Sequence, residues 1–143
     1  MKIAIGCDHG GFELKQQVVD YLKDCGIDVE DCGCYDDKSC DYPKYAQAVA
    51  GKVVTNECEQ GILICGTGIG MSIAANKITG IRAALCSDCF SAEATKLHNN
   101  ANVLCMGARV LGAGLALKIV DTFVNTEFSN DERHIRRLHL IEE

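Results

Sequence analysis

The sequence predicts an α/β fold: one Rossmann-like three-layer domain over residues 1–143, with a five-stranded parallel sheet and a C-terminal helix. Short apolar runs of β-type composition alternate with segments of helical periodicity from one end of the chain to the other. No linker, low-complexity tract or internal repeat interrupts this alternation. The expected strands are residues 2–6, 27–31, 61–65, 81–85 and 103–106.

The helices between these runs have recognisable beginnings and ends. Apolar residues recur at helical spacing over 12–25 and stop at Gly26, a residue that favours helix C-termini. A second helix is expected over 41–54, with the only proline in its first turn, where proline is tolerated. The remaining helices are expected after the glycines at 66–70, over 88–99, after Gly112 and after the capping residues 130–132.

Composition excludes several classes of protein. A net charge of −6 argues against nucleic acid or an anionic membrane as a partner. Apolar residues make up 48% and charged residues 24% of the chain, a balance typical of soluble globular proteins. No apolar run approaches the roughly 18 residues of a membrane span, and the first residues resemble a strand more than a signal peptide. We therefore expect a cytoplasmic protein.

Ten cysteines are many for such a chain. The pairs Cys32/Cys34 and Cys86/Cys89 have spacings that zinc sites use, and the second pair also fits a redox motif. Zinc would require the two pairs to converge, and disulfides suit small secreted proteins better. We therefore expect no metal, and free cysteines that serve as small apolar residues; Cys7 and Cys105 are expected in the core.

Three expected strands end in residues whose side chains could take part in catalysis or ligand binding. Asp8 and His9 follow the first strand, Cys65 and Thr67 lie at the end of the third, and Arg109 follows the fifth. In doubly wound folds ligands bind beyond the carboxyl ends of the strands, so these five side chains are candidates for one pocket. The alternatives remain open, because Asp8 and Thr67 also suit helix caps, His9 suits a structural role, and Cys65 suits a buried strand end.

The run from Cys65 to Gly70 is the most informative segment. A thiol is followed by alternating glycines, Gly66, Gly68 and Gly70, and then by an expected helix. Such a turn presents unshielded backbone N–H groups, which attract anions and favour the thiolate form of a neighbouring cysteine. A nucleotide site is a competing interpretation, although the spacing differs from G-x-G-x-x-G and the turn does not follow the first strand.

Two further groups lie elsewhere in the predicted topology. His98 and Asn99 end a helix before the fifth strand, which places them near the opposite edge of the sheet. If they act in the same site, a second subunit must supply them, which predicts a homodimer with shared sites.

Arg133 and Arg137 are four residues apart on the last helix and face the same way. Such a pair suits either a phosphate clamp or a basic face exposed to solvent.

The chain contains, in order, CDHGGF at 7–12, DYP at 41–43, CGTGIG at 65–70 with AANK at 74–77, GIRA at 80–83, HN at 98–99 and Arg109. Together these motifs resemble the type B ribose-5-phosphate isomerases, a family that includes the galactose-6-phosphate isomerase subunits. The resemblance covers nearly the whole chain. It implies interconversion of ribose 5-phosphate and ribulose 5-phosphate through an enediolate, without metal or organic cofactor.

The resemblance also implies a role for each residue. Cys65 would move the proton between C1 and C2, and His98 would open the sugar ring. The substrate would be held by the turn N–H groups, by hydroxyl contacts and by phosphate contacts. The hydroxyl contacts would come from Asp8 and Thr67, and Asn99 would contact the sugar or the enediolate. The phosphate contacts would come from His9, Arg109, Arg133 and Arg137. Tyr42 matches a position near the pocket, and the family forms dimers, with a tetramer as the alternative.

Family members that lack the cysteine carry a glutamate at the position of Met71. This chain has the cysteine and lacks that glutamate, so Cys65 is the expected base. One feature departs from the family pattern: several cysteines lie outside the motifs, at positions 25, 32, 34, 40, 58 and 89. The alternative functions are a 6-phosphohexose isomerase acting on galactose or allose 6-phosphate, and a non-catalytic nucleotide-binding module.

Overall fold

The computed structural model describes residues 1–143 and consists of five strands, six α-helices and one short 3₁₀ helix. The strands form a single parallel sheet in the order β2-β1-β3-β5-β4. The elements are β1 (Lys2–Cys7), η1 (His9–Gly11), α1 (Phe12–Asp24), β2 (Asp28–Asp31), α2 (Tyr42–Val54), β3 (Gln60–Cys65), α3 (Ile69–Ala75), β4 (Ala83–Leu85), α4 (Cys89–Asn99), β5 (Val103–Gly107), α5 (Ala113–Asn125) and α6 (Glu132–Glu142).

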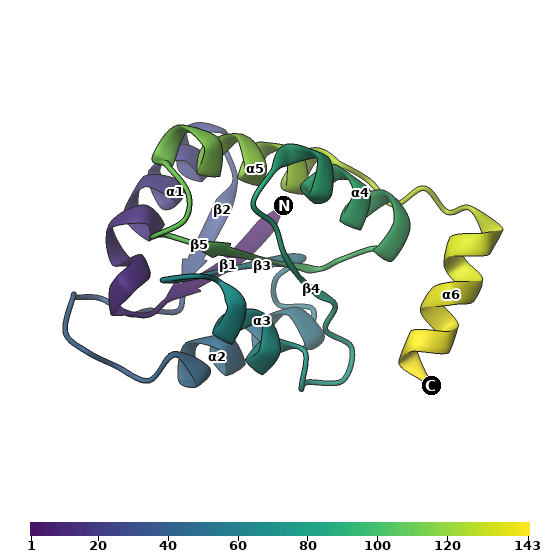
Figure 1. Cartoon of the computed structure of the whole chain (residues 1–143), viewed down its shortest axis with the longest axis horizontal. Coiled ribbons are helices and arrows are strands. Elements are labelled where there is room, and N and C mark those ends of the chain that lie inside the picture. The colour runs from purple at the N-terminus through teal and green to yellow at the C-terminus, as the bar shows by residue number, and fades with distance from the viewer.

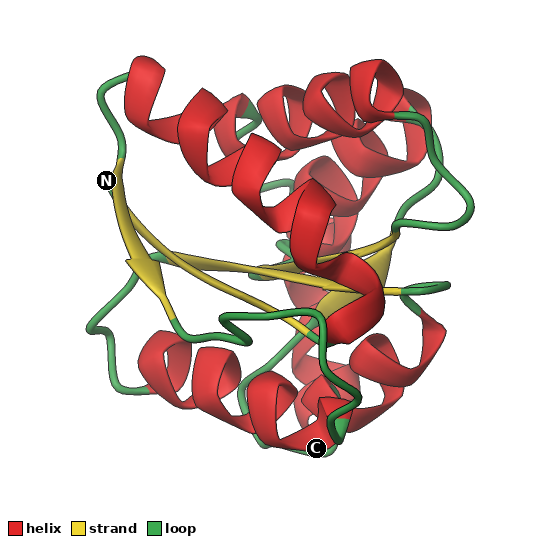
Figure 2. Cartoon of the chain, turned by 90° about the vertical axis from the view of Figure 1, so that its left-hand side faces the viewer, coloured by secondary structure: helices red, strands yellow, loops and turns green.

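Helices cover both faces of the sheet, so the predicted three-layer α/β architecture is confirmed. Helices α1, α4 and α5 lie on one face and α2 and α3 on the other (Figure 1). The layers are clear when the sheet is seen from its side (Figure 2). The C-terminal helix α6 lies apart from both layers, next to the end of α4 (Figure 1). No helix is both long and apolar enough to span a bilayer.

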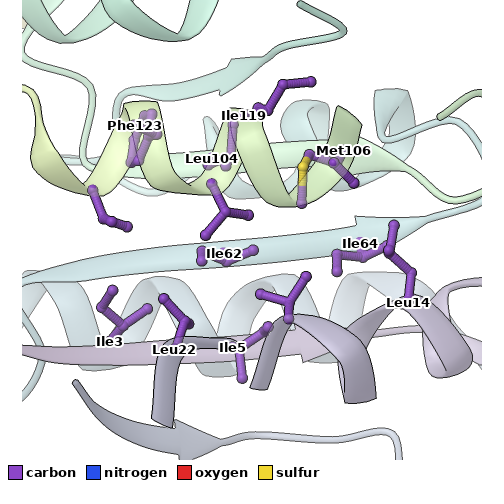
Figure 3. Packing of buried hydrophobic residues seen from close by; sticks show 14 of the residues in the cluster. Ile3, Ile5, Leu14, Leu22, Ile62, Ile64, Leu104, Met106, Ile119 and Phe123 are labelled. Carbon is purple, nitrogen blue, oxygen red and sulfur yellow. The ribbon is translucent and has the colours of Figure 1, made fainter. Parts of the chain in front are cut away.

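The core follows from the two-residue period of the strands. On β3, Ile62 and Ile64 point toward α1 and α5, whereas Leu63 and Cys65 point toward α2 and α3. Figure 3 shows the larger cluster, where Leu14 and Leu22 of α1 and Ile119 and Phe123 of α5 pack on the central strands. Burial on both faces explains why the central strands read as continuous apolar runs in the sequence.

Element boundaries agree with the sequence patterns to about one residue except at α3, which begins at Ile69, inside the glycine turn, and at β4. The apolar run 81–85 predicted a strand of five residues, but only Ala83–Leu85 pairs with β5. The N–H group of Arg82 instead donates to the side-chain oxygen of Asn102 at 2.8 Å. This side chain therefore takes the place of a strand partner and delays the start of β4.

One buried charge connects α1 to the segment after β2. Lys15 is completely buried, and its ammonium group donates to both carboxylate oxygens of Asp31 at 2.7 and 2.9 Å and to the carbonyl oxygen of Cys34 at 2.5 Å. All three N–H bonds of the ammonium group are therefore satisfied, which buried charges require. Asp31 in turn accepts the N–H of Gly33 at 2.9 Å. Lys15 thus holds residues 31–34 against the core.

We expect Lys15→Ala to lower the free energy of unfolding by about 3 kcal/mol, because it removes a buried ion pair and leaves a cavity. Urea denaturation of the variant measures the change. Lys23→Ala, at an exposed position of the same helix, is the matched control and should change stability by less than about 0.5 kcal/mol. Equal stability of the two variants would contradict this role of Lys15.

Candidate active site

Cys65 is the last residue of β3, and the chain turns sharply after it. The Cys65 Sγ accepts a hydrogen bond from the N–H of Gly68 at 3.0 Å, and the residue is 5% exposed. Gly68 has φ +79°, and a Cβ there would lie 2.7 Å from the carbonyl carbon of Met106. Only glycine fits this conformation and this approach to β5. The turn therefore directs a backbone donor at the sulfur.

The same turn has further unused donors. Thr67 Oγ1 accepts the N–H of Ile69 at 3.2 Å, a local contact of the capping kind that the sequence allowed. The N–H groups of Gly66, Thr67 and Gly70 have no acceptor within the chain. Unpaired backbone donors of neighbouring turn residues can form an anion-binding surface. A ligand oxygen placed here would find N–H groups beside the Cys65 sulfur.

Asp8 lies at the adjacent strand end, at the point where the strand order reverses. Its carboxylate accepts the N–H groups of Gly10 at 2.9 Å and Gly11 at 3.2 Å and so caps η1. A Cβ on Gly11 would lie 2.6 Å from the carbonyl oxygen of Ile64. Glycine at this position therefore allows the loop after β1 to contact the end of β3, which is where doubly wound folds bind ligands.

Arg109 completes this group from the loop after β5. Its N–H donates to the carbonyl oxygen of Gly66 at 3.0 Å. Its guanidinium nitrogens lie 3.4 and 3.7 Å from the positions that a Cβ of Gly66 and of Gly10 would occupy. The guanidinium group has no carboxylate partner in the chain. An exposed, unpaired arginine over two glycine backbones is suited to binding an anion.

His9 lies between the loop after β1 and the segment 32–41. The backbone N–H of Cys40 donates to the His9 Nδ1 at 3.3 Å, which places the proton of the ring on Nε2. His9 and Gly10 line a cavity of about 280 Å³, together with Phe12, Glu13 and Asp37. The imidazole therefore has a fixed ring orientation and a free donor nitrogen.

Tyr42 packs on the glycine turn from α2. A Cβ on Gly70 would lie 2.7 Å from the Tyr42 Cζ and 3.0 Å from its hydroxyl oxygen. Gly70 therefore leaves room for the ring. The structure thus brings Tyr42 to the same edge of the sheet as Cys65, Thr67 and Arg109.

His98 and Asn99 lie elsewhere, at the end of α4 and before β5. This is the amino end of the sheet, opposite the edge that carries Cys65, as the topology predicted. Arg82 connects this end of α4 to α6. Its Nε donates to the Asn99 carbonyl oxygen at 3.0 Å, and its guanidinium group pairs with Glu142 of α6 at 2.7 Å. Arg82 was not among the residues expected to be functional; its only signal in the sequence was its place in the GIRA motif.

Arg133 and Arg137 are exposed on α6, in the same region as His98. The rings of His98 and His134 have centroids 4.7 Å apart, and His134 is buried. Burial, together with the nearby His98 and arginines, lowers the pKa of His134. His134 therefore packs as a neutral residue against α4, whereas Arg137 has no ion-pair partner and Arg133 only a distant one, Asp131 at 3.7 Å.

The candidate residues thus form two groups within one chain. Asp8, His9, Tyr42, Cys65 to Gly70 and Arg109 surround the carboxyl edge of the sheet; His98, Asn99, Arg133 and Arg137 lie near its amino edge. None of the five cavities of the single chain is lined by Cys65. All ten cysteines are free, and no three potential metal ligands converge, the zinc pairs Cys32/Cys34 and Cys86/Cys89 included.

Comparison with known proteins relates this arrangement to one family. The family model described as Ribose/Galactose Isomerase matches residues 3–141. The chain is 48% identical over 140 residues to ribose-5-phosphate isomerase B of Escherichia coli, covering 98% of this chain and 93% of the relative.

Two solved structures agree with this match. Ribose-5-phosphate isomerase B of Clostridium thermocellum superimposes with a TM-score of 0.98 at 49% identity, covering 99% of this chain and 95% of the other. The Thermotoga maritima enzyme gives a TM-score of 0.96 at 52% identity, covering 99% and 97%. With sequence and fold in agreement along almost its entire length, the chain belongs to the Ribose/Galactose Isomerase family.

Proposed function

We propose that this protein is an aldose–ketose isomerase that interconverts ribose 5-phosphate and ribulose 5-phosphate. The observation that carries the proposal is the hydrogen bond from the Gly68 N–H to the Cys65 Sγ, which fixes the sulfur at the glycine turn whose other N–H groups are unpaired. Family membership supports the substrate class. The reaction is redox-neutral, since a proton leaves one carbon and returns to its neighbour, and it needs no cofactor.

In the proposed mechanism, His98 opens the furanose ring and Cys65 acts as the base. The Cys65 thiolate removes the proton from C2 of the aldose, and the electron pair forms the enediolate. The N–H groups of Gly66, Thr67 and Gly70 stabilise the developing oxygen charge, as in an oxyanion hole. The Cys65 thiol then returns the proton to C1, while the hydroxyl proton of O2 moves to O1 and leaves the ketone at C2. Met71, which follows the last glycine of the turn, is fully buried and apolar, so it provides no alternative base.

The other candidate residues bind the substrate in this proposal. Asp8 and Thr67 contact sugar hydroxyls, Asn99 contacts the sugar or the enediolate, and Tyr42 lies near the substrate. His9, Arg109, Arg133 and Arg137 bind the phosphate, which requires positive charge in a chain whose overall charge is −6. His9 is suited to this because its Nε2 is left free to donate.

We further propose that two copies of the chain assemble into a homodimer with shared sites. The support is the separation of the two groups of candidate residues, which leaves Cys65 without His98 in its own chain. In a two-fold dimer the amino edge of each subunit lies against the carboxyl edge of its partner. The contact therefore occurs twice and completes two sites. A tetramer would be a pair of such dimers. We place the enzyme in the cytoplasm, where sugar phosphates are metabolised.

A 6-phosphohexose isomerase is the second candidate, because the family model covers both ribose and galactose isomerases. Assays with pentose and hexose phosphates distinguish the two by kcat/KM. A higher kcat/KM for galactose or allose 6-phosphate than for ribose 5-phosphate would reject the proposed substrate but not the mechanism.

Cys65→Ala should reduce kcat about 10²–10⁴-fold, the typical contribution of a general base. Steady-state assays of ribulose 5-phosphate formation measure the effect. Cys25→Ala removes an exposed thiol at the end of α1 and is the control, with unchanged kcat. Near-normal turnover in Cys65→Ala would reject the cysteine mechanism and favour a binding module without catalysis.

Mixing inactive variants tests the shared sites. Cys65→Ala and His98→Ala should each be inactive as homodimers, but their heterodimer contains one intact site. Random reassortment of subunits should therefore restore about a quarter of wild-type activity. Absence of recovery, with heterodimers verified by differently tagged subunits, would mean that Cys65 and His98 do not meet across an interface.

Arg137→Ala should raise the KM for ribose 5-phosphate about 10–100-fold with a smaller change in kcat, because a charge-assisted phosphate contact contributes about 1.5–3 kcal/mol. Arg136→Ala, an exposed arginine one residue earlier on α6, is the matched control. Equal KM values for the two variants would indicate a solvated basic face rather than a phosphate site.

A further inference from the structure

Three cysteines that the proposed mechanism does not use gather at the end of β1. Cys7 is the last residue of β1, whereas Cys34 and Cys40 belong to the segment between β2 and α2. The sulfurs of Cys7 and Cys34 are 3.7 Å apart, and both residues are buried. Cys40 is partly exposed, and its Sγ lies 3.9 Å from the His9 Nδ1.

The backbones of Cys7 and Cys34 lie side by side. The N–H of Cys7 donates to the carbonyl oxygen of Gly33 at 2.6 Å, and the N–H of Cys34 donates to the carbonyl oxygen of Cys7 at 2.9 Å. Backbones paired in this way are about 4.8 Å apart, within the range of about 4.4–6.8 Å between the Cα atoms of a disulfide. Only the sulfurs must approach, to about 2.05 Å.

We propose that Cys7 and Cys34 form a site of reversible disulfide formation, which oxidants reach through Cys40. The buried pair reacts poorly with external disulfides by itself. Burial raises the pKa of the Cys7 thiol to about 12, although the Lys15 ammonium opposes it, and burial also raises the pKa of Cys34. Cys40 is partly exposed, lies next to the His9 imidazole, which can accept its proton, and packs against the buried cluster that contains Cys34.

The reaction balances as three thiol–disulfide exchanges with a low-molecular-weight disulfide such as oxidised glutathione. The Cys40 thiolate attacks this disulfide and releases one thiol. Cys34 then attacks the Cys40 sulfur and releases the second thiol, and Cys7 attacks the Cys34 sulfur and frees Cys40 again. In total, Cys7 and Cys34 lose two protons and two electrons, which reduce the external disulfide to two thiols.

Such a bridge would connect the strand end that carries Asp8 and His9 to the segment that orients His9. At present hydrogen bonds and the buried Lys15 hold this segment. The Cys34 thiol would lose its contact with the Asp36 carbonyl oxygen, now 3.1 Å away. Because the bridge closes a loop of the unfolded chain, the oxidised protein should have a higher Tm.

The test is incubation of the fully reduced protein with oxidised glutathione, followed by alkylation and peptide mapping by mass spectrometry. We expect a Cys7–Cys34 linked peptide pair about 2 Da lighter than its parts, which dithiothreitol cleaves. Cys34→Ala should abolish the bridge, and Cys40→Ala should slow its formation roughly ten-fold or more. Cys25→Ala, which lacks a thiol far from the cluster, should form it at the wild-type rate.

Two results would overturn the inference. In the first, Cys7 and Cys34 of the wild-type protein remain reduced while exposed thiols carry glutathione. In the second, Cys40→Ala forms the bridge as fast as the wild type, which would remove Cys40 from the route. The first result requires no variant, so it holds even if a substitution prevents folding. Because the readout is a covalent bond, it is independent of whether Cys65 is the catalytic base.

Discussion

The close contact of three strand-end loops is the constraint on which the candidate site depends. Three glycines make it possible, each with its missing Cβ facing a neighbouring backbone. A Cβ on Gly11, Gly68 or Gly107 would lie 2.6–2.7 Å from backbone atoms of Ile64, Met106 and Thr67, respectively. At such distances the loops after β1, β3 and β5 would be forced apart. The Cys65 thiol, the backbone donors and Arg109 meet in one place because the backbones touch there.

The parallel sheet explains why this place holds only part of the candidate residues. All strands run in one direction, so the loops that follow them gather at one edge, and the ends of the crossover helices gather at the other. Arg109 follows β5 and therefore lies near Cys65. His98 precedes β5 and lies at the opposite edge, where Arg82 and α6 surround it. No rearrangement of loops within one chain brings His98 to Cys65, because the length of β5 separates the two edges of the sheet.

A second network links the core to the edge that carries the site. Lys15 reaches from α1 to the segment after β2, and this segment returns a backbone donor from Cys40 to His9. The orientation of the imidazole thus depends on a buried ion pair on another element. Cys7 and Cys34 lie inside this network, which is why a change in their bonding would act on the same segment. Residues that stabilise the fold therefore also orient residues of the candidate site.

Much of this organisation could be predicted from the sequence, because it depends on local patterns. The alternation of apolar runs with helical periodicity identified all five strands and their helices, and the glycines at 66–70 marked the turn after β3. The direction of a parallel sheet then placed Asp8, Cys65 and Arg109 at one edge and His98 at the other. The strand predicted two residues too long, at 81–85, was shortened by the Asn102 side chain, a partner 20 residues away from Arg82.

What the sequence by itself determined was the fold class, the identity of the strand-end residues and their distribution between two edges. Only the tertiary structure decided which donor faces which atom: the Gly68 N–H on the Cys65 sulfur, Tyr42 over Gly70, Lys15 against Asp31 and Cys34, and Cys7 beside Cys34. The physical reason is the distance along the chain over which each kind of interaction acts. Periodicity and capping act over a few residues, whereas these contacts join elements that are distant in sequence and are set by how closely their backbones pack.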